Sequence, residues 1–91
     1  NDVIAKIPEQ EENLCFRVFP NPAANKLTVD LENFNGVNKT IKLYETSGKL
    51  VFEMEPTSSQ TTIDVSGFAT GIYSLEIANE EHVLRSQVII D

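Results

Sequence analysis

The side chains that most often do chemistry in proteins are few in this chain and scattered along it. Cys15 and His82 are the only cysteine and the only histidine, so neither has a second thiol or imidazole with which to complete a zinc site. Ser47, Ser66 and Ser74 have no histidine partner other than His82, and none lies in a strained glycine elbow. The sequence also lacks a glycine-rich phosphate loop. We therefore predict a protein that is not an enzyme and has no catalytic residue, cofactor or metal ligand.

The charge of the chain limits its partners. It has 14 Asp and Glu residues against 7 Lys and Arg, which gives a net charge of −7 at pH 7. Nucleic acids and anionic membrane surfaces attract clustered basic side chains, and no run approaches the roughly 18 apolar residues of a membrane span. We therefore predict no nucleic-acid partner and no membrane insertion. The acidic stretch DLENFN at residues 30–35 is interpreted as a solvated loop, because its spacing does not follow that of a calcium loop.

Apolar residues recur at every second position through most of the chain, which is typical of strands with one buried face. Turn-forming residues separate these runs, and Gly48 in the Thr46–Lys49 turn is expected to supply a positive φ. The pattern predicts an all-β fold, a seven-stranded antiparallel immunoglobulin-like β-sandwich. The seven strand segments centre on residues 16–18, 27–31, 41–43, 50–54, 63–65, 73–77 and 84–90.

Residues 1–15 do not share this pattern. They are acidic toward their end, are interrupted by Pro8 and show no sustained period. We interpret 1–15 as a linker and 16–91 as the folded domain, with Cys15 acting as a small, partly buried hydrophobic residue at the entrance of the first strand.

A Pro-Asn-Pro corner follows the first strand segment. Pro20 and Pro22 each fix φ and remove a backbone donor, so the chain leaves the strand at a defined angle and cannot extend its ladder through the corner. Asn21 is expected to bond nearby backbone groups through its amide.

Three motifs in series carry a resemblance to a known family. They are the corner within FRVFPNPAANKLTVDL (16–31), the segment LYETSGK (43–49) and the segment DVSGFATGIYSL (64–75), and a last strand follows them. Over residues 16–91 the chain resembles the C-terminal sorting domain of proteins exported by the type IX (Por) secretion system of Bacteroidetes-type bacteria. The matching positions, which we interpret as structural, are Pro20, Asn21, Pro22, Ser47, Gly48, Gly71, Tyr73 and Leu75.

The resemblance implies a passenger label without catalytic activity. A cargo domain would precede residues 1–15 and cross the periplasm, the type IX outer-membrane translocon would recognise the label, and a sortase-like peptidase would remove it. The cargo would then remain on the outer-membrane surface or outside the cell. We expect the label to be a monomer whose only partners are these proteins.

The resemblance also implies that the last strand carries the signal, and we expect it or a neighbouring sheet edge to pair with a strand of a transport component. Terminal strands in the family often carry several basic residues, whereas here Arg85 is the only one in this strand and the chain closes on Asp91. The expected recognition residues are Leu84, Arg85, Val88, Ile89, Ile90 and Asp91.

Two other functions remain open at the level of sequence. An immunoglobulin-like adhesive or spacer module of a surface protein would bind through its loops and tolerate the loss of its last residues. A carbohydrate-binding accessory module of a secreted protein would present exposed aromatic rings, but the chain has no Trp and most of its Phe and Tyr residues fall on positions expected to face the core.

Overall fold

The computed structural model describes residues 3–6, 15–34 and 38–91. Every described strand pairing is antiparallel, and the described residues form no helix. The strands are β1 (Val3–Lys6), β2 (Cys15–Phe19), β3 (Lys26–Asp30), β4 (Thr40–Glu45), β5 (Leu50–Met54), β6 (Gln60–Asp64), β7 (Gly71–Ala78) and β8 (Val83–Ile90).

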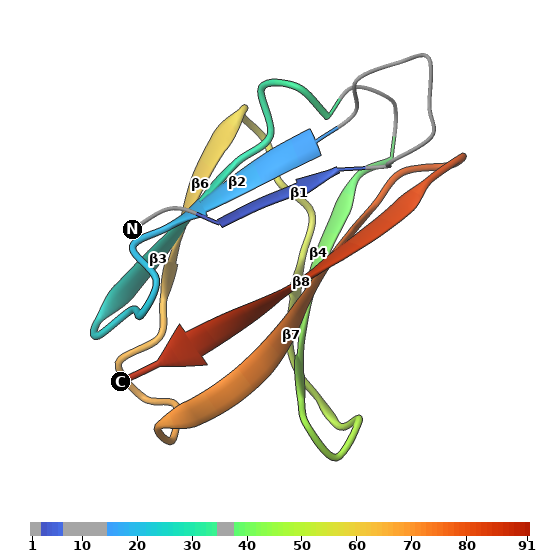
Figure 1. Ribbon diagram of the computed structural model, residues 1–91. Coiled ribbons are helices and arrows are strands. Elements are labelled where there is room, and N and C mark those ends of the chain that lie inside the picture. The colour runs from blue at the N-terminus through green and yellow to red at the C-terminus, as the bar shows by residue number, and fades with distance from the viewer. Residues whose placement is uncertain (1–2, 7–14, 35–37) are drawn as a thin grey trace.

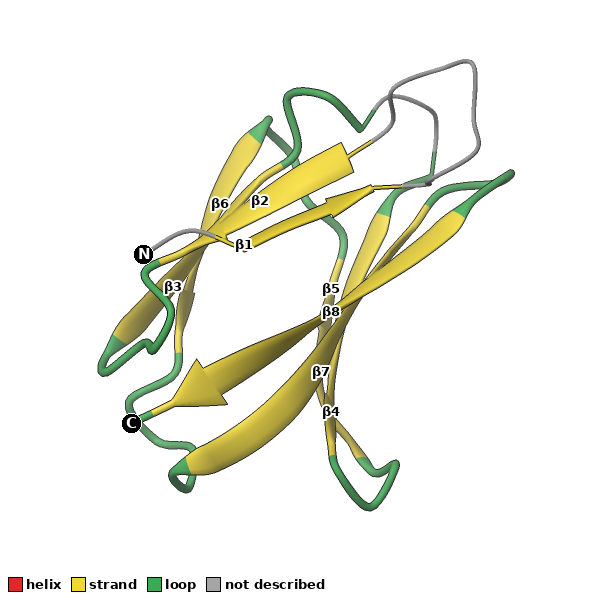
Figure 2. Cartoon of the chain, viewed as in Figure 1, coloured by secondary structure: helices red, strands yellow, loops and turns green. Residues whose placement is uncertain are grey.

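The strands form two four-stranded sheets that face one another. One sheet has the order β1-β2-β3-β6 and the other has the order β5-β4-β7-β8. Figures 1 and 2 show the two sheets as two layers, with the last strand, β8, at the edge of its sheet and ending next to the C-terminus. The prediction of seven antiparallel strands from Phe16 onward is confirmed, because β2 to β8 fall on the seven predicted segments.

The core fills the space between the sheets. Alternate residues of a strand point to opposite faces, and the inward set is almost wholly removed from solvent. Burying one such Leu, Ile, Val or Phe side chain contributes roughly 1.5–3 kcal/mol, so the apolar alternation is the main source of stability in a chain with no disulfide. The largest fully buried side chains are Phe16, Phe34, Leu27, Leu31, Ile41, Leu43, Ile63, Leu75, Ile77, Ile90, Val18 and Val29.

The interpretation of residues 1–15 as a linker needs correction for Val3–Lys6. These four residues form β1 and pair with β2, from Val3 opposite Val18 to Lys6 opposite Cys15. The sequence VIAK is too short to show a period, but its β-branched residues suit an extended backbone, and the unpaired edge of β2 provides its partner. The rest of the predicted linker before β2, residues 1–2 and 7–14, lies outside the described residues.

Strand β5 departs from simple alternation. The sequence places Leu50 on the same face as Phe52 and Met54, whereas Leu50 is 42% exposed. A bulge between Leu43 and Tyr44 shifts the register, so that Phe52 lies opposite inward-facing Leu43 but Leu50 lies opposite Tyr44 on the outer face.

The predicted solvated loop at residues 30–35 is wrong for its first residue. Asp30 is buried; its Oδ1 accepts a hydrogen bond from the Glu32 N–H at 3.0 Å, and its Oδ2 lies 3.2 Å from Nη2 of Arg17. The Glu32 N–H, and to a lesser degree the Arg17 guanidinium, hold the pKa of Asp30 below its ordinary value despite the burial. At the other end of the stretch Phe34 belongs to the core, and Asn35 lies outside the described residues.

Candidate recognition site at the terminal strand

The six predicted recognition residues lie on two different faces of the terminal strand. Leu84, Val88 and Ile90 point inward and are buried in the core. Arg85, Ile89 and Asp91 are exposed, as the alternation of the strand requires. A partner that meets the folded domain therefore has access to the second group of side chains and not to the first.

The Pro-Asn-Pro corner closes the end of β8. The Ile89 N–H donates to Oδ1 of Asn21 at 2.9 Å. The Ala23 N–H donates to the Ile89 carbonyl at 2.8 Å, and the Asp91 N–H donates to the Ala23 carbonyl at 2.7 Å. The corner thus forms an isolated parallel bridge beside the end of β8, with Ala23 paired to Ile90.

The expectation that the Asn21 amide bonds nearby backbone groups is therefore wrong, because its bond is long-range. Its partner Ile89 lies 68 positions away, whereas sequence reasoning expected nearby backbone. The peptide bonds before Pro20 and Pro22 are both cis. Sequence reasoning missed Ala23, because its burial in the core becomes visible only when the corner is placed against β8.

The other motif positions support turns and the core. Gly48 has φ +94° in the β4–β5 hairpin, where its N–H donates to the Glu45 carbonyl at 2.9 Å, and Gly71 has φ +152° at the start of β7. Both values favour glycine. Ser47 donates its hydroxyl to the Glu45 carboxylate at 3.2 Å.

Tyr73 and Leu75 point inward from β7. Leu75 is fully buried, and the Tyr73 ring lies 6.0 Å from that of Phe68. The Tyr73 hydroxyl donates to the Ala69 carbonyl at 2.7 Å, which satisfies the one polar atom of a buried ring.

A buried carboxylate anchors Arg85 on the outer face of the second sheet. Oε1 of Glu76 accepts from Arg85 Nε at 2.9 Å and lies 2.8 Å from Nη2. Glu76 is buried although it lies on the face turned away from the core, because its neighbours on β4 and β8 cover it. Sequence reasoning missed Glu76, and the only signal that would have found it is the register that places it opposite Arg85.

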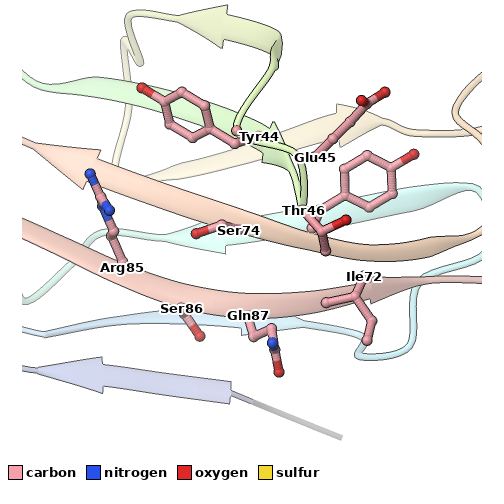
Figure 3. A pocket seen from close by; sticks show the side chains of 10 residues that line it. Tyr44, Glu45, Thr46, Ile72, Ser74, Arg85, Ser86 and Gln87 are labelled. Carbon is pink, nitrogen blue, oxygen red and sulfur yellow. The ribbon is translucent and has the colours of Figure 1, made fainter.

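A hollow of about 620 Å³ lies beside this ion pair and opens to solvent. Figure 3 shows that its side chains come from β4, β7 and β8 and the hairpin after β4, and include Tyr44, Ile72, Ser74, Arg85 and Gln87. Motif residues Gly48 and Tyr73 also contribute to its wall. Ile72, in the lining, forms a cross-strand pair with Ile89, and both residues are more than two-fifths exposed, at 45% and 42%.

The lining of this hollow is a mixture of hydroxyl, amide, aromatic and aliphatic groups with one arginine and one glutamate. Within the described part of the chain, no three His, Cys, Asp or Glu side chains gather as a metal-binding group. The same residues include no helix long and apolar enough to cross a membrane.

Comparison with known proteins identifies related chains. The family model described as secretion system C-terminal sorting domain matches residues 17–91. An endo-acting ulvan lyase of Formosa agariphila is 31% identical over 67 residues, a match that covers 72% of this chain and 13% of the lyase. The chain therefore spans only a small part of that relative's length.

A solved structure shares the fold. It is PorZ of Porphyromonas gingivalis, described as an essential bacterial surface component of the type-IX secretion system, and it superposes with a TM-score of 0.68 at 16% identity. The superposition covers 81% of this chain and 11% of that chain.

Proposed function

The chain belongs to the family of secretion system C-terminal sorting domains, and from that membership we propose that it directs an N-terminal cargo through the type IX outer-membrane translocon. The domain has no catalytic role of its own. A sortase-like peptidase then cleaves the domain off, and the cargo stays attached to the cell surface.

The observation that carries this proposal is the extent of the family match. It runs over residues 17–91 and so includes the Pro-Asn-Pro corner and the whole of β8, the two parts that the Asn21–Ile89 hydrogen bond joins. The match to the ulvan lyase supports a modular arrangement, because a segment like this one is there combined with a much longer chain. We accordingly assign 16–91 to the sorting domain and 1–15 to the connection with the cargo, with β1 docked on β2.

Of the six predicted recognition residues, we assign contact with the translocon to the three that are exposed, Arg85, Ile89 and Asp91. Leu84, Val88 and Ile90 serve recognition indirectly, because their burial fixes the strand against β7 and the corner. The remaining motif positions hold the turns and the core. This assignment narrows the six predicted residues to three that a partner can contact in the folded domain.

We also infer that the two sheets have an immunoglobulin-like topology. Two features support it: the order β5-β4-β7-β8, in which two hairpins lie side by side in one sheet, and the Tyr73 hydroxyl bonded to a backbone carbonyl four residues upstream, at the beginning of β7. A tyrosine in that position is a recurrent feature of immunoglobulin-like domains. The topology would also suit an adhesive module, so fold does not decide function.

Secretion of a reporter tests the sorting role. The reporter carries a periplasmic signal peptide at its start and residues 1–91 at its end, and is expressed in a type IX-competent strain. A second version lacks Val88–Asp91, and a third experiment uses a strain whose translocon is inactive. We expect surface delivery only with the complete tail and an active translocon.

The adhesive alternative predicts a different result. The reporter would then stay periplasmic in every version, in cells that export their own type IX cargo normally. That result would reject the sorting role for this domain.

A further inference from the structure

The outer edge of β8 has backbone groups that point away from the sheet. Within the described residues, β8 is hydrogen-bonded to β7 alone as a strand neighbour. In an antiparallel pair, the N–H and C=O of one residue point to the same side and successive residues alternate. Both groups of Ile89 point away from β7, toward the corner. Because the β7–β8 register is continuous, the N–H and C=O of Gln87 and Arg85 also point away from β7.

The corner divides this edge into two stretches. From Ile89 to Asp91 it is closed by Asn21 and Ala23. From Val83 to Gln87 no strand of the described chain pairs with it: β1 approaches β8 from the other sheet but pairs with β2. Proteins usually protect such an edge with Lys, Pro or a bulge, yet β8 has the sequence VLRSQVII and an unshifted register.

Charges of alternating sign cross the outer face of this sheet and end at the open edge. The register places Glu53 beside Lys42, Lys42 beside Glu76 and Glu76 beside Arg85. The Arg85 side chain is 68% exposed, so it is the last charge in the series and the one that an added strand would meet. The side chain that continues this series in a further strand is acidic.

A second position on the same face defines the partner further. Val83 lies two residues from Arg85, on the same side of the sheet, and is 57% exposed. An apolar side chain in the added strand would cover it. Opposite Gln87, a polar side chain suffices.

We propose that the edge of β8 from Val83 to Gln87 is an interaction surface that binds an extended segment of a protein partner. The segment continues the sheet through hydrogen bonds to the backbone of Arg85 and Gln87. It carries an acidic side chain beside Arg85 and an apolar one beside Val83. The proposal rests on the sorting function, because the partner is the component of the export apparatus that recognises the tail.

A proline at position 87 tests the edge. Gln87→Pro removes an N–H that points away from β7, so the β7–β8 ladder keeps its hydrogen bonds. Its matched control is Thr62→Pro. The Leu31 N–H donates to the Ser59 carbonyl, and the Val65 N–H donates to the Asn25 carbonyl, so odd-numbered residues of β6 bond toward β3. The N–H of Thr62 therefore points away from β3, toward the free side of β6. Both variants are made in the reporter that carries residues 1–91.

We expect Gln87→Pro to lower surface delivery at least about tenfold, which corresponds to about 1.4 kcal/mol of lost partner binding. Thr62→Pro should secrete as the unchanged tail does, and the two variants should have similar melting temperatures. Equal secretion of the two variants would overturn the proposal, as would Gln87→Ala lowering delivery as much as Gln87→Pro, because the side chain would then be responsible. If the unchanged tail is not secreted, the sorting function fails instead.

A binding experiment covers the case in which the proline variant does not fold. Purified residues 1–91 are titrated with a nine-residue peptide of alternating Val and Thr with a central Glu, and with the same peptide carrying a central Lys. Backbone amide NMR signals report the contact. We expect the acidic peptide to bind about fivefold more tightly, the magnitude of one exposed ion pair. The signals of Arg85 and Gln87 should shift while that of Thr62 does not.

The preference should reverse in Arg85→Glu. Equal affinity for the two peptides, shifts confined to other strands, or binding of neither peptide would each contradict the proposal.

Discussion

The two faces of β8 differ in what they offer, although the sequence presents them as one terminal strand. The inward face, Leu84, Val88 and Ile90, is part of the core. The outward face presents Arg85, held by a buried carboxylate, and Ile89, beside the exposed Ile72. Loss of secretion after a change in this strand therefore has two origins, loss of the fold or loss of contact with the partner. Changes on the inward face act through the fold, and changes on the outward face act through the contact.

The largest difference between the faces should appear in stability. Ile90→Ala leaves a cavity between the sheets and should lower the free energy of unfolding by about 2–5 kcal/mol. Ile89→Ala removes an exposed side chain and should change it by no more than about 0.5 kcal/mol. Denaturant unfolding of both purified variants measures the difference, and similar losses in both would show that the faces have been assigned wrongly.

A smaller effect should come from the corner that closes the end of the strand. Asn21→Ala removes the acceptor of the Ile89 N–H and should cost about 1 kcal/mol. It should also accelerate hydrogen exchange of the Ile89 amide, while Asn21→Asp, which keeps an acceptor, should not. In the unchanged domain the Ile89 amide should exchange more slowly than that of Gln87 on the open stretch. Equal exchange at the two amides would remove the distinction between closed and open edge.

The smallest effect on stability should come from the ion pair of the other sheet, between Arg17 and Asp30. The pKa of Asp30 is lowered in the folded state from 3.8, so the carboxylate contributes stability at pH values above 3.8. That contribution is lost as the pH falls below 3.8 and through the lowered pKa. Asp30→Asn should therefore be less stable at neutral pH and lose less stability on acidification. The melting temperatures of both proteins, measured between pH 5 and pH 2, test this difference. An equal decline of the two melting temperatures would contradict this role for Asp30.

The local patterns of the sequence predicted most of the fold. Period-two alternation located β2 to β8, and turn chemistry located the Gly48 hairpin, because both depend on residues close together in the chain. Strand β1 was not predicted, because four residues are too few to show a period. The exposure of Leu50 was not predicted, because the bulge that shifts the register has no signal in the sequence.

The candidate site was predictable only in outline. The terminal strand and the corner were identified as separate motifs, but their union depends on a hydrogen bond between residues 68 positions apart. The Glu76–Arg85 pair and the hollow beside it depend on which strands are neighbours and in which register. Those are tertiary properties that propensity and spacing do not determine.

We propose that the folded tail is recognised through the exposed side of its terminal strand. The most direct measurement is surface delivery of the reporter carrying Ile89→Asp, with the melting temperature of the purified tail measured alongside. We predict delivery at least about tenfold lower with a melting temperature within a few degrees of the unchanged tail. Undiminished delivery of this folded variant would contradict the claim and would place recognition elsewhere on the domain.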